Sequence, residues 1–106
     1  MSAFKTVGLV SRVANEQVRE SLERAEKALL AAGVAVVFEP TSAEMLGKTG
    51  RDCASLNDMG SRCDLLIAVG GDGNILSAAR AMAPHGVPIL GINRGRSEEH
   101  TSELQS

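Results

Sequence analysis

Four short runs rich in apolar residues recur along the chain, and each has the length of a β-strand. They occupy residues 4–10, 34–38, 65–69 and 87–92. The run at 34–38 is apolar throughout, which is typical of a strand covered on both faces. Helical patterns lie between the first two runs and between the last two. The chain is therefore predicted to be an α/β protein with a Rossmann-like parallel sheet, flanking helices and right-handed crossovers.

The clearest helical pattern covers residues 16–32. Its apolar residues recur at steps of four and three and so share one face: Val18, Leu22, Ala25, Leu29 and Ala32. Asn15 is placed to cap the first turn, and Gly33 is placed to end the helix. A second helix is predicted over residues 74–82, ended by Pro84-His85-Gly86.

Residues 39–63 carry the weakest pattern. Pro40-Thr41-Ser42 predicts a turn, and a short helix is expected near residues 51–59. Gly47-Lys48-Thr49 is similar to the end of a P-loop, but the full pattern needs glycine at position 42, where this chain has Ser42. Because Glu44 would also repel a phosphate, a solvated loop is favoured.

The stretch Gly70-Gly71-Asp72-Gly73 lies between an apolar strand pattern and an Ala-rich helical pattern. A glycine turn before a helix N-terminus lets backbone N–H groups approach a phosphate, and ligands of such sheets bind beyond the carboxyl ends of strands. Asp72 adds a carboxylate that can act as a general base or organise a metal–phosphate complex. Alternatively, Asp72 only caps a helix that starts near Gly73 or Asn74. Three flanking glycines are more than a cap requires.

A second loop, Gly91-Ile92-Asn93-Arg94-Gly95, also follows a predicted strand directly. If the two strands are neighbours, this loop lies beside the first one. Asn93 could then bind a nucleotide, and Arg94 could meet a phosphate. An ordinary strand-ending turn explains the same residues equally well, so both interpretations stay open.

Composition and charge narrow the function classes. The formal net charge of −2 gives no basic field for nucleic acid, and no apolar run approaches the roughly 20 residues of a membrane span. Cys53 and Cys63 lack C-x-x-C spacing and are expected to be reduced thiols. His85 and His100 lack metal-ligand spacing, and Arg80 is expected to face solvent. We expect a cytoplasmic protein with no protein-held metal and no nucleic-acid or membrane partner.

Taken together, these residues resemble the N-terminal part of the bacterial NAD kinase family. The matching pieces are residues 4–10, Ala68–Leu76 with Ala78-Ala79-Arg80, and Pro88 with Ile89–Gly95. The glycine motif alone is shared with phosphofructokinases and with diacylglycerol and sphingosine kinases. Its occurrence together with Gly91–Gly95 at this spacing favours NAD kinase.

The resemblance implies a reaction in which the γ-phosphate of ATP moves to the 2′-hydroxyl of the adenosine ribose of NAD, with Mg²⁺ as the divalent cation. Asp72 would be the catalytic residue that accepts the hydroxyl proton, and Gly73 would bind NAD beside it. Gly70 and Gly71 would cradle phosphate, and Asn93 would lie near the same pocket. A full-length member is expected to be a homo-oligomer. The alternatives are a lipid or sugar kinase that shares the motif, or a non-catalytic nucleotide-binding module.

The resemblance stops after Gly95. The family continues with an apolar segment and a β-rich domain that carries an Asn-Asp or Asn-Glu pair, whereas residues 96–106 are polar and resemble a translated sequencing adapter. We therefore expect residues 1–95 to be a partial N-terminal α/β domain of a two-domain kinase and residues 96–106 to be a non-native tail. The chain alone is expected to be inactive. Codons for 96–106 unrelated to such an adapter would contradict this expectation.

Overall fold

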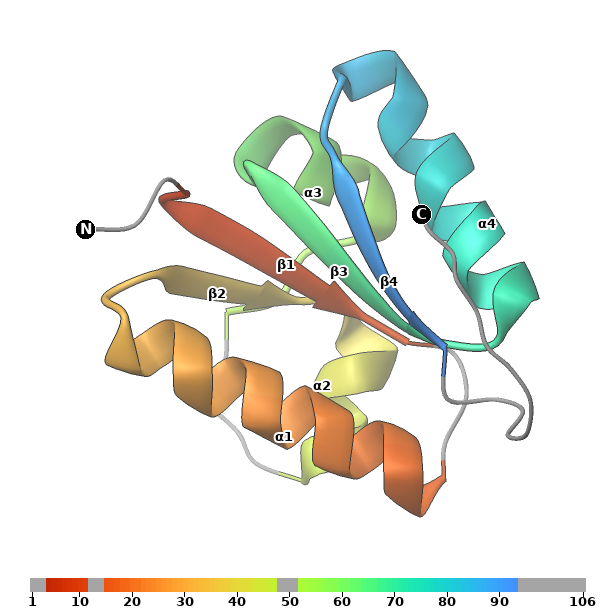
Figure 1. The fold of residues 1–106 in the computed structure, drawn as a ribbon. Coiled ribbons are helices and arrows are strands. Elements are labelled where there is room, and N and C mark those ends of the chain that lie inside the picture. Colours follow the sequence, from red (N-terminus) through yellow and green to blue (C-terminus); the bar gives the residue numbers. More distant parts are fainter. Residues whose placement is uncertain (1–3, 12–14, 48–51, 94–106) are drawn as a thin grey trace.

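The computed structural model describes residues 4–11, 15–47 and 52–93 (Figure 1). Four parallel strands form one sheet in the order β2-β1-β3-β4: β1 (Thr6–Val10), β2 (Ala35–Phe38), β3 (Leu65–Gly70) and β4 (Ile89–Asn93). The helices are α1 (Glu16–Ala31), α2 (Pro40–Leu46), α3 (Leu56–Arg62) and α4 (Asp72–Met82), with a 3₁₀ turn, η1 (Ala83–His85), after α4. The predicted parallel α/β sheet with flanking helices is confirmed.

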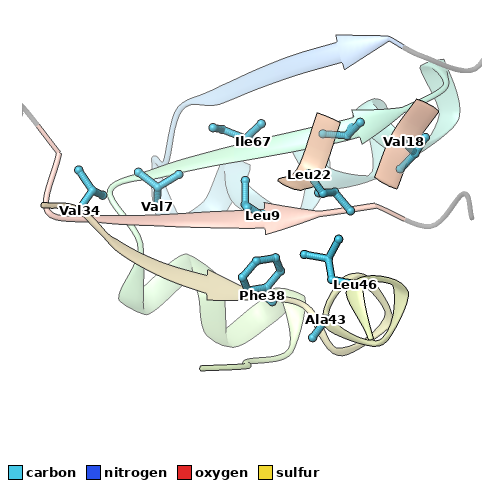
Figure 2. Packing of buried hydrophobic residues seen from close by; sticks show 10 residues of the cluster. Val7, Leu9, Val18, Leu22, Val34, Phe38, Ala43, Leu46 and Ile67 are labelled. Atoms are coloured by element: carbon cyan, nitrogen blue, oxygen red, sulfur yellow. The ribbon is translucent and has the colours of Figure 1, made fainter. Parts of the chain in front are cut away.

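Helices cover both faces of this sheet because each central strand alternates its side chains between them. In β3, Ile67 and Val69 face α1 and α2, whereas Leu66 and Ala68 face α3 and α4. The first face, shown in Figure 2, buries Val7, Leu9, Val18, Leu22, Val34, Phe38, Ala43, Leu46, Ile67 and Val69. The second buries Val10, Val37, Ala54, Met59, Cys63, Leu66, Ala68, Ala78 and Met82. The buried side chains are mainly aliphatic, and Phe38 is the aromatic member of these two clusters.

The order of the strands reverses direction between β1 and β3. The chain moves from β1 through α1 to β2 on one side, and from β3 through α4 to β4 on the other, so α1 and α4 lie on opposite faces. In open sheets of this kind, ligands bind outside the carboxyl ends of the strands at such a reversal. Among the described helices, none is long and apolar enough to cross a membrane.

Helix α1 has the ends that the sequence predicts. The Asn15 side chain accepts a hydrogen bond from the backbone N–H of Val18 at 2.9 Å. Gly33, with φ of +78°, follows the last turn in the left-handed conformation that ends helices. The predicted apolar face is one residue too long, since Ala32 is exposed and serves as the C-cap.

Replacing Asn15 by alanine should lower the free energy of unfolding by about 1 kcal/mol, because the N–H of Val18 loses its acceptor. Urea denaturation of the 106-residue chain measures the change. Asn15→Asp keeps an acceptor at the same place and should unfold within about 0.5 kcal/mol of the unsubstituted chain. Equal losses in the two variants would contradict a capping role.

The predicted turn at Pro40-Thr41-Ser42 is wrong, since these residues form the first turn of α2. Proline is tolerated there because it lacks an N–H that the first turn would leave without a helical partner. The Glu39 carboxylate accepts hydrogen bonds from the N–H groups of Thr41 (3.0 Å) and Ser42 (3.3 Å). Gly47, with φ of +70°, then ends the helix. Proline and glycine therefore mark the two ends of a helix here.

The other boundaries differ from the prediction by a few residues. The expected helix near 51–59 is α3, displaced toward the C-terminus, because Asp52 and Ala54 bond to the backbone of Phe38 at 2.8 and 2.9 Å. Those bonds keep residues 52–54 extended along β2, and the helix begins only after the Ser55 cap. Helix α4 starts two residues earlier than predicted, at Asp72. Strand β4 starts two residues later, after Pro88, which has no N–H for the ladder.

Candidate functional site

Strand β3 passes into helix α4 through one intervening residue, Gly71. Gly70, the last residue of the strand, has φ of +147°, a conformation that side-chain-bearing residues rarely adopt. A Cβ atom added to Gly70 would also lie 3.1 Å from Nδ2 of Asn74. The sharp turn therefore requires glycine at position 70.

Asn74 holds this turn from the inside. Its side chain is 9% exposed, and its Nδ2 donates a hydrogen bond to the carbonyl oxygen of Val69 at 2.9 Å. The first turn of α4 is thereby tied to the end of β3. No separate role for Asn74 was predicted from the sequence. The available signal was its spacing, because Asn74 shares the buried face of α4 with Ala78 and Met82 at intervals of four residues.

Helix α4 begins after a glycine rather than after a capping side chain. Gly71 is its N-cap, and in the described part of the chain no side chain caps the first turn. A Cβ atom added to Gly71 or Gly73 would meet no atom of the described residues within 4 Å, and neither residue has a positive φ. The fold itself therefore does not require glycine at 71 or 73. What glycine provides there is unobstructed access to backbone N–H groups at the positive end of the helix dipole.

Asp72 is the first residue of α4, and its side chain is exposed. Its Oδ1 accepts a hydrogen bond from Nδ2 of Asn93 at 2.5 Å. The alternative in which Asp72 serves as the helix cap is not what the structure has, because Gly71 occupies the N-cap position. The carboxylate instead stands at the edge of the sheet beside the open helix terminus.

Residues 91–93, predicted to begin the second loop, are the last residues of strand β4, which is the neighbour of β3. Strands β3 and β4 pair in a register that places Gly70 opposite Asn93. The side chain of Asn93 contacts Asp72, a partner that the sequence analysis did not foresee. Arg94 and Gly95 lie outside the described residues, and the contact of Asn93 with a nucleotide stays a prediction.

The remaining candidates lie away from this edge or do not carry the predicted chemistry. Gly47 ends a helix, whereas a P-loop glycine precedes one. Four of the sequence-based predictions fall outside the described residues: Lys48, Thr49, His100 and the tail at 96–106. Arg80 is exposed as expected. His85 is exposed on η1, and its ring packs against Gly60 of α3.

The cysteines and acidic residues form no metal centre in the regions that the structure describes. Cys53 is exposed and Cys63 is buried, and neither forms a disulfide. Burial raises the pKa of the Cys63 thiol, which keeps it protonated and unreactive at neutral pH. Within residues 4–11, 15–47 and 52–93, no group of three or more His, Cys, Asp or Glu side chains is placed to hold an ion.

A parallel sheet that reverses its strand order, with a glycine turn opening a helix at its carboxyl edge, is typical of α/β nucleotide-binding domains. The family model described as the ATP-NAD kinase N-terminal domain matches residues 7–104. NAD kinases from Pseudomonas fluorescens Pf-5 and Pseudomonas putida W619 are 44% and 43% identical to this chain over 95 residues. The chain belongs to the ATP-NAD kinase family.

These relatives are longer than the chain. The matched residues make up 90% of this chain and 32% of each Pseudomonas NAD kinase, so the chain spans about a third of their length. Among solved structures, yeast NADH kinase complexed with NADH superposes with a TM-score of 0.69 at 23% identity, covering 87% of this chain and 32% of that one. This superposition supports the fold.

Proposed function

We propose that the chain forms the N-terminal, catalytic-aspartate-bearing part of an enzyme that transfers the γ-phosphate of ATP to the 2′-hydroxyl of the adenosine ribose of NAD. The observation that carries the proposal is the position of Asp72, exposed at the open N-terminus of α4 and contacted by Asn93. Membership of the ATP-NAD kinase family supports this acceptor over a lipid or a sugar.

Phosphoryl transfer needs little from the protein beyond alignment of the two substrates and stabilisation of the charge on the transferred group. An exposed carboxylate can accept the proton of the ribose 2′-hydroxyl as the hydroxyl oxygen attacks the γ-phosphorus, while the bond between that phosphorus and the β–γ bridging oxygen breaks and ADP leaves. The backbone at Gly71 and Gly73 can supply N–H donors for a phosphate, because glycine has no side chain that would block access to them. We therefore propose that NAD binds at Asp72 and Gly73 and that a phosphate group lies close to Gly70 and Gly71.

A magnesium ion would enter this site with the triphosphate. Asp72 is the one carboxylate among residues 70–74 and 89–93, and the described residues form no three-ligand cluster. This donor set fits Mg²⁺ that is held mainly by phosphate oxygens and water, as is usual for nucleotide-bound Mg²⁺. The ion would neutralise charge on the transferred phosphoryl group.

A chimaera tests the proposal. Residues 1–95 of this chain are joined to the part of the Pseudomonas fluorescens NAD kinase that lies beyond the matched residues. With ATP and Mg²⁺, the chimaera should convert NAD to NADP and leave diacylglycerol and fructose 6-phosphate unchanged, whereas the 106-residue chain alone should convert none of them. A folded chimaera that phosphorylates the lipid or the sugar but not NAD would overturn the proposal.

Gly73→Ala should raise the stability of the protein and lower its affinity for NAD. Alanine lowers the conformational entropy of the unfolded chain and meets no neighbour, so the free energy of unfolding should rise by about 0.5 kcal/mol. The added methyl group occupies space proposed for NAD, so the Kd of the chimaera for NAD should rise about tenfold or more. Urea denaturation and calorimetric titration measure the two changes. Unchanged NAD affinity would place the ligand elsewhere.

A further inference from the structure

We propose that Asn93 is a positioning residue that holds the Asp72 carboxylate in the orientation needed to accept a proton. Asn93 is the last residue of β4 and Asp72 is the first residue of α4, yet Nδ2 of Asn93 lies 2.5 Å from Oδ1 of Asp72. The inference rests on the proposed function and assigns to Asn93 a role that acts through Asp72.

Both ends of this hydrogen bond are carried by closely packed backbone. Strand β4 pairs with β3 up to Asn93 itself, and α4 is tied to β3 through Asn74 and Val69. Helix α4 also packs tightly on β4, since a Cβ atom added to Gly91 would lie 2.9 Å from the Ile75 side chain. The backbone on both sides is therefore held in place, so the Asn93 amide can fix the orientation of the Asp72 carboxylate.

The Asn93 amide is a suitable hydrogen-bond donor to a carboxylate that acts as a base. An amide is neutral, so it orients the carboxylate without the strong charge compensation of a lysine or arginine, which would oppose proton uptake. Among the described residues, Asn93 is the hydrogen-bond partner of the Asp72 side chain and engages Oδ1. Oδ2 is then the oxygen that faces the acceptor hydroxyl.

The bond is poorly placed to stabilise the fold. Asp72 and Asn93 are both exposed, and hydrogen bonds exchanged with water at a surface contribute little net stability. The turn is held independently by Gly70 and Asn74. Loss of the Asn93 amide should thus affect turnover much more than the stability of the protein.

A double-mutant cycle in the chimaera separates positioning from direct substrate binding. Asn93→Leu removes the donor at similar volume and should lower kcat about 30-fold, with KM for NAD changed less than about threefold. On an Asp72→Asn background, the same substitution should change the residual rate less than about twofold. If KM rises in both backgrounds, or the two losses in kcat multiply, Asn93 acts independently of Asp72 and the proposal is wrong.

An exchange variant separates positioning from a merely structural contact. Asp72→Asn combined with Asn93→Asp retains an amide–carboxylate pair but moves the carboxylate to β4. The melting temperature of the 106-residue chain should stay within about 3 °C, while turnover by the chimaera should stay at the level of Asp72→Asn alone. Restored turnover would show that the pair only supports the fold.

A measurement on the 106-residue chain tests the inference without any turnover. Three-bond Hα–Hβ couplings in NMR should give Asp72 one dominant χ1 rotamer, and Asn93→Leu should average the couplings over several rotamers. Equal couplings in the two proteins would overturn the positioning role. A chimaera that leaves NAD unphosphorylated would instead count against the proposed function, whatever the couplings.

Discussion

Asp72→Asn in the chimaera is expected to lower kcat for NADP formation about 10³-fold, because asparagine cannot accept the proton of the ribose hydroxyl. The Kd for NAD should change less than about threefold, since asparagine has nearly the same volume and still forms hydrogen bonds. Single-turnover kinetics and calorimetric titration measure the two quantities separately.

The matched control for this substitution is Asp58→Asn. Asp58 is an exposed carboxylate in the first turn of α3, outside β3, β4 and α4. Its replacement should leave kcat and the Kd for NAD unchanged. Retention of more than about a tenth of the turnover by Asp72→Asn would remove Asp72 as the general base.

Gly70→Ala is expected to lower the free energy of unfolding by about 2 kcal/mol, the largest stability effect predicted here. Alanine at φ of +147° is strained, and its methyl group would approach the Asn74 amide that ties the turn to β3. Urea denaturation of the 106-residue chain measures the loss, and the chimaera should lose turnover because Asp72 is displaced.

Gly73→Ala serves as the reference for this measurement. It introduces the same methyl group three residues away, at an ordinary backbone conformation and in open space. If both glycines tolerate alanine equally well, the conformation at Gly70 does not set the geometry of the turn.

Strong local patterns made the sheet and α1 predictable. The strand runs are apolar on both faces because helices cover both sides of the sheet, and the α1 pattern carries its own cap at Asn15. The position of Asp72 at the carboxyl edge also followed from the order of a strand, a glycine turn and a helix. Each of these features is encoded within a few neighbouring residues.

Two features that escaped prediction depend on partners distant in sequence. Residues 52–54 are extended because they bond to Phe38, and no periodicity within them reveals this. The contact between Asn93 and Asp72 depends on the register of β3 against β4, which cannot be derived from either strand alone. At Pro40, a residue typical of turns was also compatible with the first turn of a helix, and the capping carboxylate of Glu39 decided between them.

The single residue between β3 and α4 also bears on the thermodynamics of binding. A linker of one residue contributes only two soft backbone torsions, and the residues beside it are restrained by the pairing of Gly70 with Asn93 and by the hydrogen bond from Asn74 to Val69. Few degrees of freedom would remain to be frozen if the proposed phosphate bound at this turn. A ligand bound there would therefore meet a preorganised backbone, and the entropic penalty of binding would fall mainly on the ligand itself.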